Sequence, residues 1–178
     1  MRKSIIAILM TFCLSIMTYA QTPRDRATEL KEQAQSSLNQ KDYIKARYLF
    51  KKAYEAFATR ENYPQAIECG VQANALYVRE NFYKEGFELC RDMDQLIWAG
   101  EQNQKKVFYD LRFLVNKERL QMYTALKNPA QAKTQLNKLE ETANLAKNDS
   151  LTEVLLYTKA NYYYTFNQNT QGDACFLL

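Results

Sequence analysis

Glycine and proline are scarce in this chain of 178 residues, which has 4 Gly and 3 Pro. Together they make up about 4% of the residues, where average usage is roughly 12%. Strands are joined by tight turns that depend on Gly, Pro, Asn and Asp. The shortage therefore argues against a β-sandwich, a β-barrel or a doubly wound sheet.

Histidine is absent altogether. This removes the commonest general base, the commonest zinc ligand and the usual partner of a nucleophilic Ser or Cys. No Gly-rich phosphate loop, nucleophile elbow or metal-binding motif is present either. The sequence therefore predicts a protein that is not an enzyme, with no catalytic residues, no cofactor and no bound metal.

The first 20 residues have the pattern of a secretory signal peptide. Arg2 and Lys3 precede an uncharged, mostly apolar run over residues 4–17, and Ala20 ends a small-residue cleavage site. The alternative is a transmembrane anchor, but the run is shorter than the roughly 20 residues that a span needs. We expect cleavage near Ala20 and a periplasmic or secreted bacterial protein.

Charge and cysteine usage narrow the class of the remaining segment, residues 21–178. It carries 22 Lys and Arg against 20 Asp and Glu, with the signs interleaved. This balance is typical of a solvated helical surface and predicts no binding of nucleic acid. Its cysteines, Cys69, Cys90 and Cys175, are predicted to be buried free thiols, with a Cys69–Cys90 disulfide as the alternative in an exported protein.

Apolar residues recur at steps of three and four, which predicts amphipathic helices. The prolines Pro23, Pro64 and Pro129 each suit a helix start, and Ser150 fits a capping box with Glu153. The connections between helices are short, so consecutive helices should be antiparallel neighbours. We expect an all-α fold with eight helices over residues 23–39, 43–60, 64–81, 84–99, 102–126, 129–147, 150–168 and 171 to the end.

A helix-start pattern repeats along the chain: a turn residue, a small residue three later, then two apolar residues. The small residues are Ala46, Gly86, Ala132 and, in part, Ala174, separated by 40, 46 and 42 positions. Residues 39–53, with Ala46 at their centre, resemble the second helix of a tetratricopeptide repeat (TPR). Leu30 and Ala34 fit the family's preceding helix, whereas Asn74 stands where the second unit should have a small residue.

The resemblance to the TPR family, here with helices longer than usual, covers about residues 23–178. It implies antiparallel helix-turn-helix repeats stacked as an α-α superhelix, a TPR-like solenoid. We expect a signal peptide over residues 1–20 and a repeat domain over residues 21–178. That domain would comprise about three and a half helix pairs and continue beyond Leu178, because the last helix lacks a cap. The uncapped helix is also a possible contact for homo-oligomers.

The same resemblance implies a concave groove lined by the first helix of each pair. Its candidate partner-binding residues are Lys31, Gln35, Arg79, Lys117, Gln121, Lys159 and Tyr163, accompanied by Val71, Ala75, Val78, Thr124 and Phe166. The Lys/Gln pairs at i, i+4 could hold a peptide carboxylate; the alternative is ordinary solvated helix polarity. Tyr162 is expected to pack inside, and Trp98 beside Gly100 is expected at a helix end.

These observations predict a periplasmic, non-enzymatic TPR module that binds a protein or peptide or assembles with copies of itself. The alternative function is the sensory input region of a membrane-anchored bacterial regulator. In such regulators a histidine kinase or DNA-binding output module lies outside this sequence.

Overall fold

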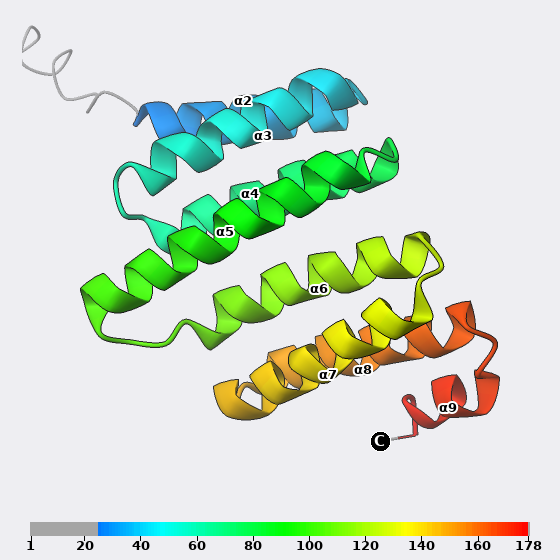
Figure 1. The fold of residues 1–178 in the computed structure, drawn as a ribbon. Coiled ribbons are helices and arrows are strands. Elements are labelled where there is room, and N and C mark those ends of the chain that lie inside the picture. The colour runs from blue at the N-terminus through cyan, green and yellow to red at the C-terminus, as the bar shows by residue number, and fades with distance from the viewer. Residues whose placement is uncertain (1–24, 178) are drawn as a thin grey trace, which may run out of the picture.

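The computed structural model describes residues 25–177, and the prediction of an all-α fold is confirmed for this part of the chain. Eight α-helices and no strands form it (Figure 1). The helices are α2 (Arg26–Asn39), α3 (Tyr43–Ala58), α4 (Tyr63–Arg79), α5 (Tyr83–Gln104), α6 (Tyr109–Ala125), α7 (Pro129–Ala146), α8 (Asp149–Thr165) and α9 (Asn169–Ala174).

The helices stack in chain order from α2 to α9, each antiparallel to the next (Figure 1). Every helix packs against its successor, and α6 also contacts both α4 and α8. The first helices of neighbouring pairs therefore contact one another, α4 with α6 and α6 with α8. The second helices pack on the outside of this row of first helices. This arrangement is an all-α helical repeat solenoid.

All seven connections between the described helices contain one residue in the left-handed backbone region, and none of these residues is glycine. At the first connection Lys41 has φ 62°, and the amide N–H of Asp42 donates to the carbonyl of Ser37 over 2.9 Å. The same bond closes the next turn, from Asn62 to Phe57. Both are the Schellman C-cap, which normally recruits glycine. The scarcity of glycine is therefore compatible with tight turns, which this chain builds from Lys, Glu and Asn.

The predicted helix starts at Pro64 and Pro129 are confirmed, and so is Asn128 as an N-cap. Asn62 and Asn128 cap α4 and α7, each side chain accepting from an amide N–H of the first turn, with Pro64 and Pro129 in that turn. At α8 the prediction was wrong by two residues, because Asn148 rather than Ser150 is the N-cap and accepts from the Ser150 N–H. The predicted start at Pro23 lies outside the described residues.

The largest error in the predicted boundaries concerns α5 and α6. We expected helix over 84–99 and 102–126, whereas α5 runs on to Gln104 and α6 begins at Tyr109. Gly100 was expected near a helix end, but it is buried within α5. A Cβ at this position would lie 2.8 Å from Cε2 of Phe108, so glycine here serves close packing and does not end the helix.

The final helix also differs from its prediction over residues 171 to the end. Helix α9 ends at Ala174, so the expectation of a helix still running at the last residues is wrong for the described part. Ala46, Gly86 and Ala132 are buried as the repeat pattern requires, but Ala174 is exposed. Gly172 is buried there instead, close against the ring of Tyr164.

Two hydrophobic clusters form the core, and α6 belongs to both. Leu111, Val115 and Met122 of α6 join the cluster that extends through α2 to α5. Phe113 and Leu120, on the other side of α6, join the cluster with α7 and α8. This helix therefore joins the two halves of the solenoid.

The described helices include none that is long and apolar enough to cross a membrane. The predicted signal peptide lies outside the described residues. Cys69, Cys90 and Cys175 are buried and unbonded, as the free-thiol prediction required.

Candidate functional site

A groove of about 380 Å³ runs between α6 and α8. From α6 it is lined by Lys117, Gln121 and Thr124, which share one face because they are spaced four and three residues apart. From α8 it is lined chiefly by Tyr157 and Asn161, which are spaced in the same way. The groove therefore lies between the first helices of two consecutive pairs, where the resemblance placed a concave surface.

The charged side chains that line this groove are both positive. They are Lys117 and Lys127, and among residues 25–177 no Asp or Glu side chain lines it. Glu118, the neighbour of Lys117 on α6, is 2% exposed and accepts a hydrogen bond from Asn74 on α4, with its Oε1 3.8 Å from the Nζ of Lys117. Because the carboxylate of Glu118 is buried and the two lysines border the groove, the sign of charge that a ligand meets there is positive.

The groove also offers contact area and neutral hydrogen-bonding groups. Tyr157 is 62% exposed and Val154 is 38% exposed, both on the α8 wall. The amides of Gln121 and Asn161 face it from opposite walls and can each donate or accept. An apolar strip beside polar groups of one charge is suited to a short amphipathic anion or a peptide.

Two of the predicted partner-binding residues, Lys117 and Gln121, line this groove together with Thr124. The first unit's residues do not. The Nζ of Lys31 lies 2.8 Å from Glu68 Oε2 and donates to Gln65 Oε1 over 2.9 Å, so this lysine bridges α2 to α4.

Gln35 donates to Asn39 one turn along α2, and the guanidinium of Arg79 lies 4.0 Å above the ring of Tyr43. The Nζ of Lys159 lies 2.7 Å from Glu140 on α7, and that hydrogen bond raises its pKa. Each of these residues has an intramolecular partner.

The predicted aromatic cluster on α8 contributes mainly to packing. Tyr162 is buried, as expected, and Tyr163 packs edge-on against it with ring centroids 5.3 Å apart. Phe166 also packs on Tyr162, and the Tyr164 hydroxyl donates to Asp173 over 2.7 Å. Of the accompanying predicted residues, Val71 and Val78 pack against the first core cluster. The sequence analysis singled out the aromatic residues 162–164 of α8 and missed Tyr157 and Asn161. The i, i+4 spacing of these two residues places them on one helix face and could have identified them.

A second cavity, larger at about 490 Å³, lies between α5, α6 and α7 and was not anticipated from the sequence. Trp98, 62% exposed, is in its wall. Because α5 continues to Gln104, the expectation that this residue lies at a helix end was wrong. The sequence feature that could have drawn attention to this cavity is Trp98 itself, because it is the single tryptophan of the chain. Within residues 25–177, no cluster of three or more acidic or thiol side chains is placed to hold a metal ion.

Comparison with known proteins adds no relative. No family model matches the chain, and neither a curated protein nor a solved structure matches it.

Proposed function

We propose that this protein is a non-enzymatic binding module of the TPR type, which holds an anionic peptide in the groove between α6 and α8. Support comes from one observation above all: Lys117 and Lys127 line the groove, and no carboxylate does. An anion entering it meets two cations with no competing negative charge at the wall. Support for the TPR class is the repeat pattern of the sequence together with the stacked helix pairs.

The chemistry of the walls suggests how such a peptide would lie. The ammonium group of Lys117 and the amide of Gln121 would hold a carboxylate, either a side chain or a C-terminus. Tyr157, on the facing wall, supplies a rigid and largely exposed ring for an apolar neighbour in the peptide. The structure offers no comparable free wall on α2, where Lys31 is paired with Glu68.

The test uses a fluorescein-labelled peptide of alternating Glu and Leu with a free C-terminal carboxylate, and its counterpart of alternating Lys and Leu. Fluorescence anisotropy should show binding of the first and not of the second. Lys117→Gln should weaken binding of the acidic peptide about five- to tenfold, since one charge-assisted hydrogen bond is lost. The double variant with Lys127→Gln should weaken it further.

Matched controls separate groove binding from general charge. Lys31→Gln and Lys159→Gln each remove one positive charge from residues that pair with Glu68 and Glu140, outside the groove. Both should bind the acidic peptide as the unaltered protein does. Equal weakening by these variants, or none from Lys117→Gln, would show that the groove is not the site.

We further propose that the protein is exported, on the sequence of residues 1–20. A chain produced in a bacterial host with an intact export system should be recovered from the periplasm with Gln21 as its first residue. Recovery from the cytoplasm with Met1 retained would contradict export.

A further inference from the structure

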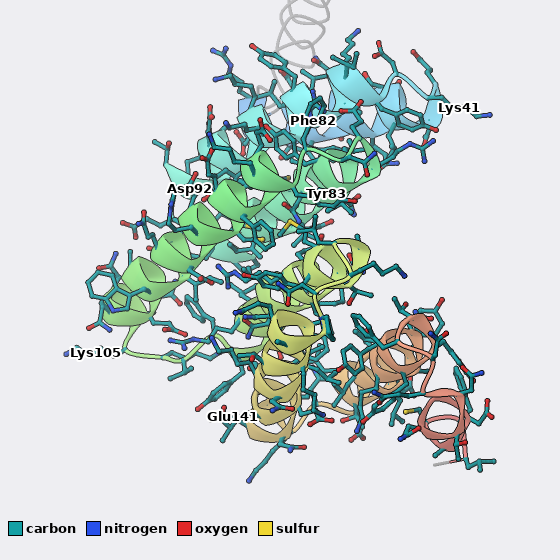
Figure 2. The ribbon with its side chains drawn as sticks, turned by 45° about the vertical axis from the view of Figure 1, so that its right-hand side comes forward. Lys41, Phe82, Tyr83, Asp92, Lys105 and Glu141 are labelled. Atoms are coloured by element: carbon teal, nitrogen blue, oxygen red, sulfur yellow. The ribbon has the colours of Figure 1, made fainter. Side chains whose placement is uncertain are left out.

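The cavity between α5, α6 and α7 lies on a different side of α6 from the peptide groove. Its α6 wall includes Arg112, Asn116 and Arg119, whereas Lys117 and Gln121 line the groove. At 100° per residue the two sets point in directions more than about 100° apart. In Figure 2, Glu141 marks the α7 wall, and Lys105 marks the far end of α5. A ligand in this cavity would leave the groove free.

One end of the cavity is apolar. Trp98 on α5 is 62% exposed, Leu145 on α7 is 51% exposed, and Tyr109 of α6 lies in the same wall. None of the three belongs to either core cluster. Because Trp98 and Leu145 stay largely exposed there and Tyr109 is half-buried beside them, this end suits an apolar group of a ligand.

The other end carries positive charge, and hydrogen bonds between helices fix its position. Arg119 donates through Nη2 to the carbonyl of Cys90 over 2.9 Å and to Asp94, which places it near the middle of α5. Asn116 Nδ2 lies 3.5 Å from Thr142 Oγ1, and because α6 and α7 are antiparallel this contact gives their register. This register brings Lys138, four residues before Thr142, to the same end as Arg119. Leu145 falls at the opposite end.

The cations at the two ends are not equivalent. Arg112, near the apolar end, donates through Nε to Glu101 over 2.7 Å and forms a second bond to it through Nη2, so its charge is matched. At the other end Arg119 is paired with Asp94 in the same way, whereas Lys138 has no ion pair among the described residues. The unmatched positive charge of the cavity is therefore that of Lys138, at the end that it shares with Arg119.

Glu141 is the carboxylate that opposes an anion in this cavity. It lies one turn from Lys138 on the α7 wall, exposed and without an ion pair among the described residues. The remaining acidic side chain of the lining, Asp94, is already bound to Arg119. A compact anion placed between Arg119 and Lys138 gains the unmatched charge of Lys138 and the remaining N–H donors of Arg119, and it meets the carboxylate of Glu141 about one helical turn away.

We propose that this cavity is a second binding site, which takes a small amphipathic anion. Its carboxylate is held by Arg119 and Lys138, and its apolar chain lies against Trp98, Tyr109 and Leu145. The positions of Lys138 and Leu145 along α7 are about 10 Å apart, a span that a carboxylate with a medium-length alkyl or aryl chain covers. The site is independent of the proposed peptide groove.

Trp98 makes the test direct, because it is the only tryptophan in the chain. The full chain is titrated with octanoate while Trp98 emission is recorded. We expect a saturable change with half-saturation at or below about 1 mM. Octylammonium, which reverses the charge, should bind at least about tenfold more weakly, and acetate, which lacks the apolar chain, should produce no change.

Three exposed positions test the orientation without disturbing the core. Lys138→Gln should weaken the binding of octanoate about tenfold, and Leu145→Ser should weaken it about threefold to tenfold. Glu141→Gln should tighten it about threefold, because the opposing carboxylate is removed. Lys133→Gln, on α7 outside the cavity, is the matched control and should leave binding unchanged.

Three results would overturn the proposal. The first is no saturable response to octanoate in the unaltered chain, and the second is octylammonium binding as tightly as octanoate. The third is a response to the acidic Glu-Leu peptide but none to octanoate, which would make the cavity a protein-docking surface. Weaker octanoate binding by Glu141→Gln would equally contradict the assigned orientation.

Discussion

Glu118 on α6 accepts a hydrogen bond from the side-chain amide of Asn74 on α4, with 3.1 Å between Nδ2 and Oε2, and both side chains are buried. Asn74 stands where the repeat pattern expects a small residue, and Glu118 is its partner 44 positions away. Burial raises the pKa of Glu118, while Asn74 and the nearby Lys117 lower it by less. The contact between first helices of two consecutive pairs therefore contains a carboxyl group that holds its proton more tightly than an exposed glutamate does.

This pair predicts a specific dependence of stability on pH. The pKa of Glu118 in the folded protein is above its ordinary value of 4.5. The folded state thus binds this proton more tightly than the unfolded state, and stability falls as the pH rises from about 4.5 through the folded pKa. Glu118→Gln removes this loss. Urea unfolding at pH 8 should show the variant more stable by about 1 kcal/mol, with the difference vanishing near pH 4. A variant less stable at pH 8 would contradict the assignment.

Glu101 predicts the opposite sign. Hydrogen bonds from Arg112 and from the backbone N–H of Phe108 lower its pKa below 4.5, against the effect of burial. Its contribution to stability is therefore present above pH 4.5 and lost as the pH falls through the folded pKa. Glu101→Gln should cost about 2 kcal/mol at pH 7, and the difference should shrink in acid. Glu140→Gln, which removes a carboxylate that is 31% exposed where Glu101 is 6% exposed, should cost less than about 1 kcal/mol. Equal costs for the two variants would argue against a special role of Glu101.

Gly100 should resist replacement by alanine, although alanine is the better helix former by about 1 kcal/mol. A Cβ there would lie 2.8 Å from Phe108 and 3.0 Å from Tyr63, whose rings pack on each other with centroids 5.7 Å apart. Both rings would have to move, so Gly100→Ala should destabilise the protein by about 1–3 kcal/mol in thermal or urea unfolding. Gln102→Ala, exposed on the same helix, should change stability by less than about 0.5 kcal/mol. A stabilised Gly100→Ala variant would show that the close approach is not real.

Glu61 should accept glycine with a gain in stability. Its φ of 57° lies in the left-handed region, which costs a residue with a side chain about 1–2 kcal/mol. Glycine relieves this strain but loses about 0.5–1 kcal/mol through the greater entropy of the unfolded chain. A net gain of about 0.5–1 kcal/mol in urea unfolding is therefore expected for Glu61→Gly. The control Lys133→Gly, within α7, should lose about 1 kcal/mol. Loss of stability at both positions would disprove the strain argument.

Cys69 and Cys90 should be unreactive in the folded protein. Burial raises the pKa of the Cys69 thiol to about 11 and that of Cys90 to about 12, so neither forms thiolate at pH 8. Mass spectrometry after brief treatment with iodoacetamide should find both unmodified in the native protein and both alkylated in guanidinium. Rapid native alkylation of either thiol, or a Cys69–Cys90 disulfide in the purified protein, would contradict this environment.

Local patterns in the sequence predicted the architecture well, because a solenoid is built from contacts between neighbouring elements. The spacing of Ala46, Gly86 and Ala132 located three helix contacts, and Asn128 with Pro129 located a helix start. The α5–α6 boundary failed for a nonlocal reason. In the sequence, Gly100 suggested that a helix ends nearby. Only its contacts with the rings of Phe108 and Tyr63 show that this glycine lies in a packed interior.

The candidate site was predicted in part for the same reason. Lys117 and Gln121 share a helix face whatever surrounds them, so their spacing was enough to group them. Lys31 and Arg79 looked equally free in the sequence, yet Lys31 is paired with Glu68 two helices further on, and Arg79 lies over the ring of Tyr43 on the preceding helix. Whether a surface cation is available to a ligand depends on residues distant in sequence, which periodicity does not reveal.

The sequence by itself determined an all-α chain of short-linked, antiparallel helices, since helical periodicity and capping act within a few residues. Only the tertiary structure decided that the turns use left-handed Lys, Glu and Asn in place of glycine. It alone paired Asn74 with Glu118 and opened cavities on two sides of α6. These features arise where helices far apart in the chain meet, and there packing and charge pairing across the contact outweigh local preference.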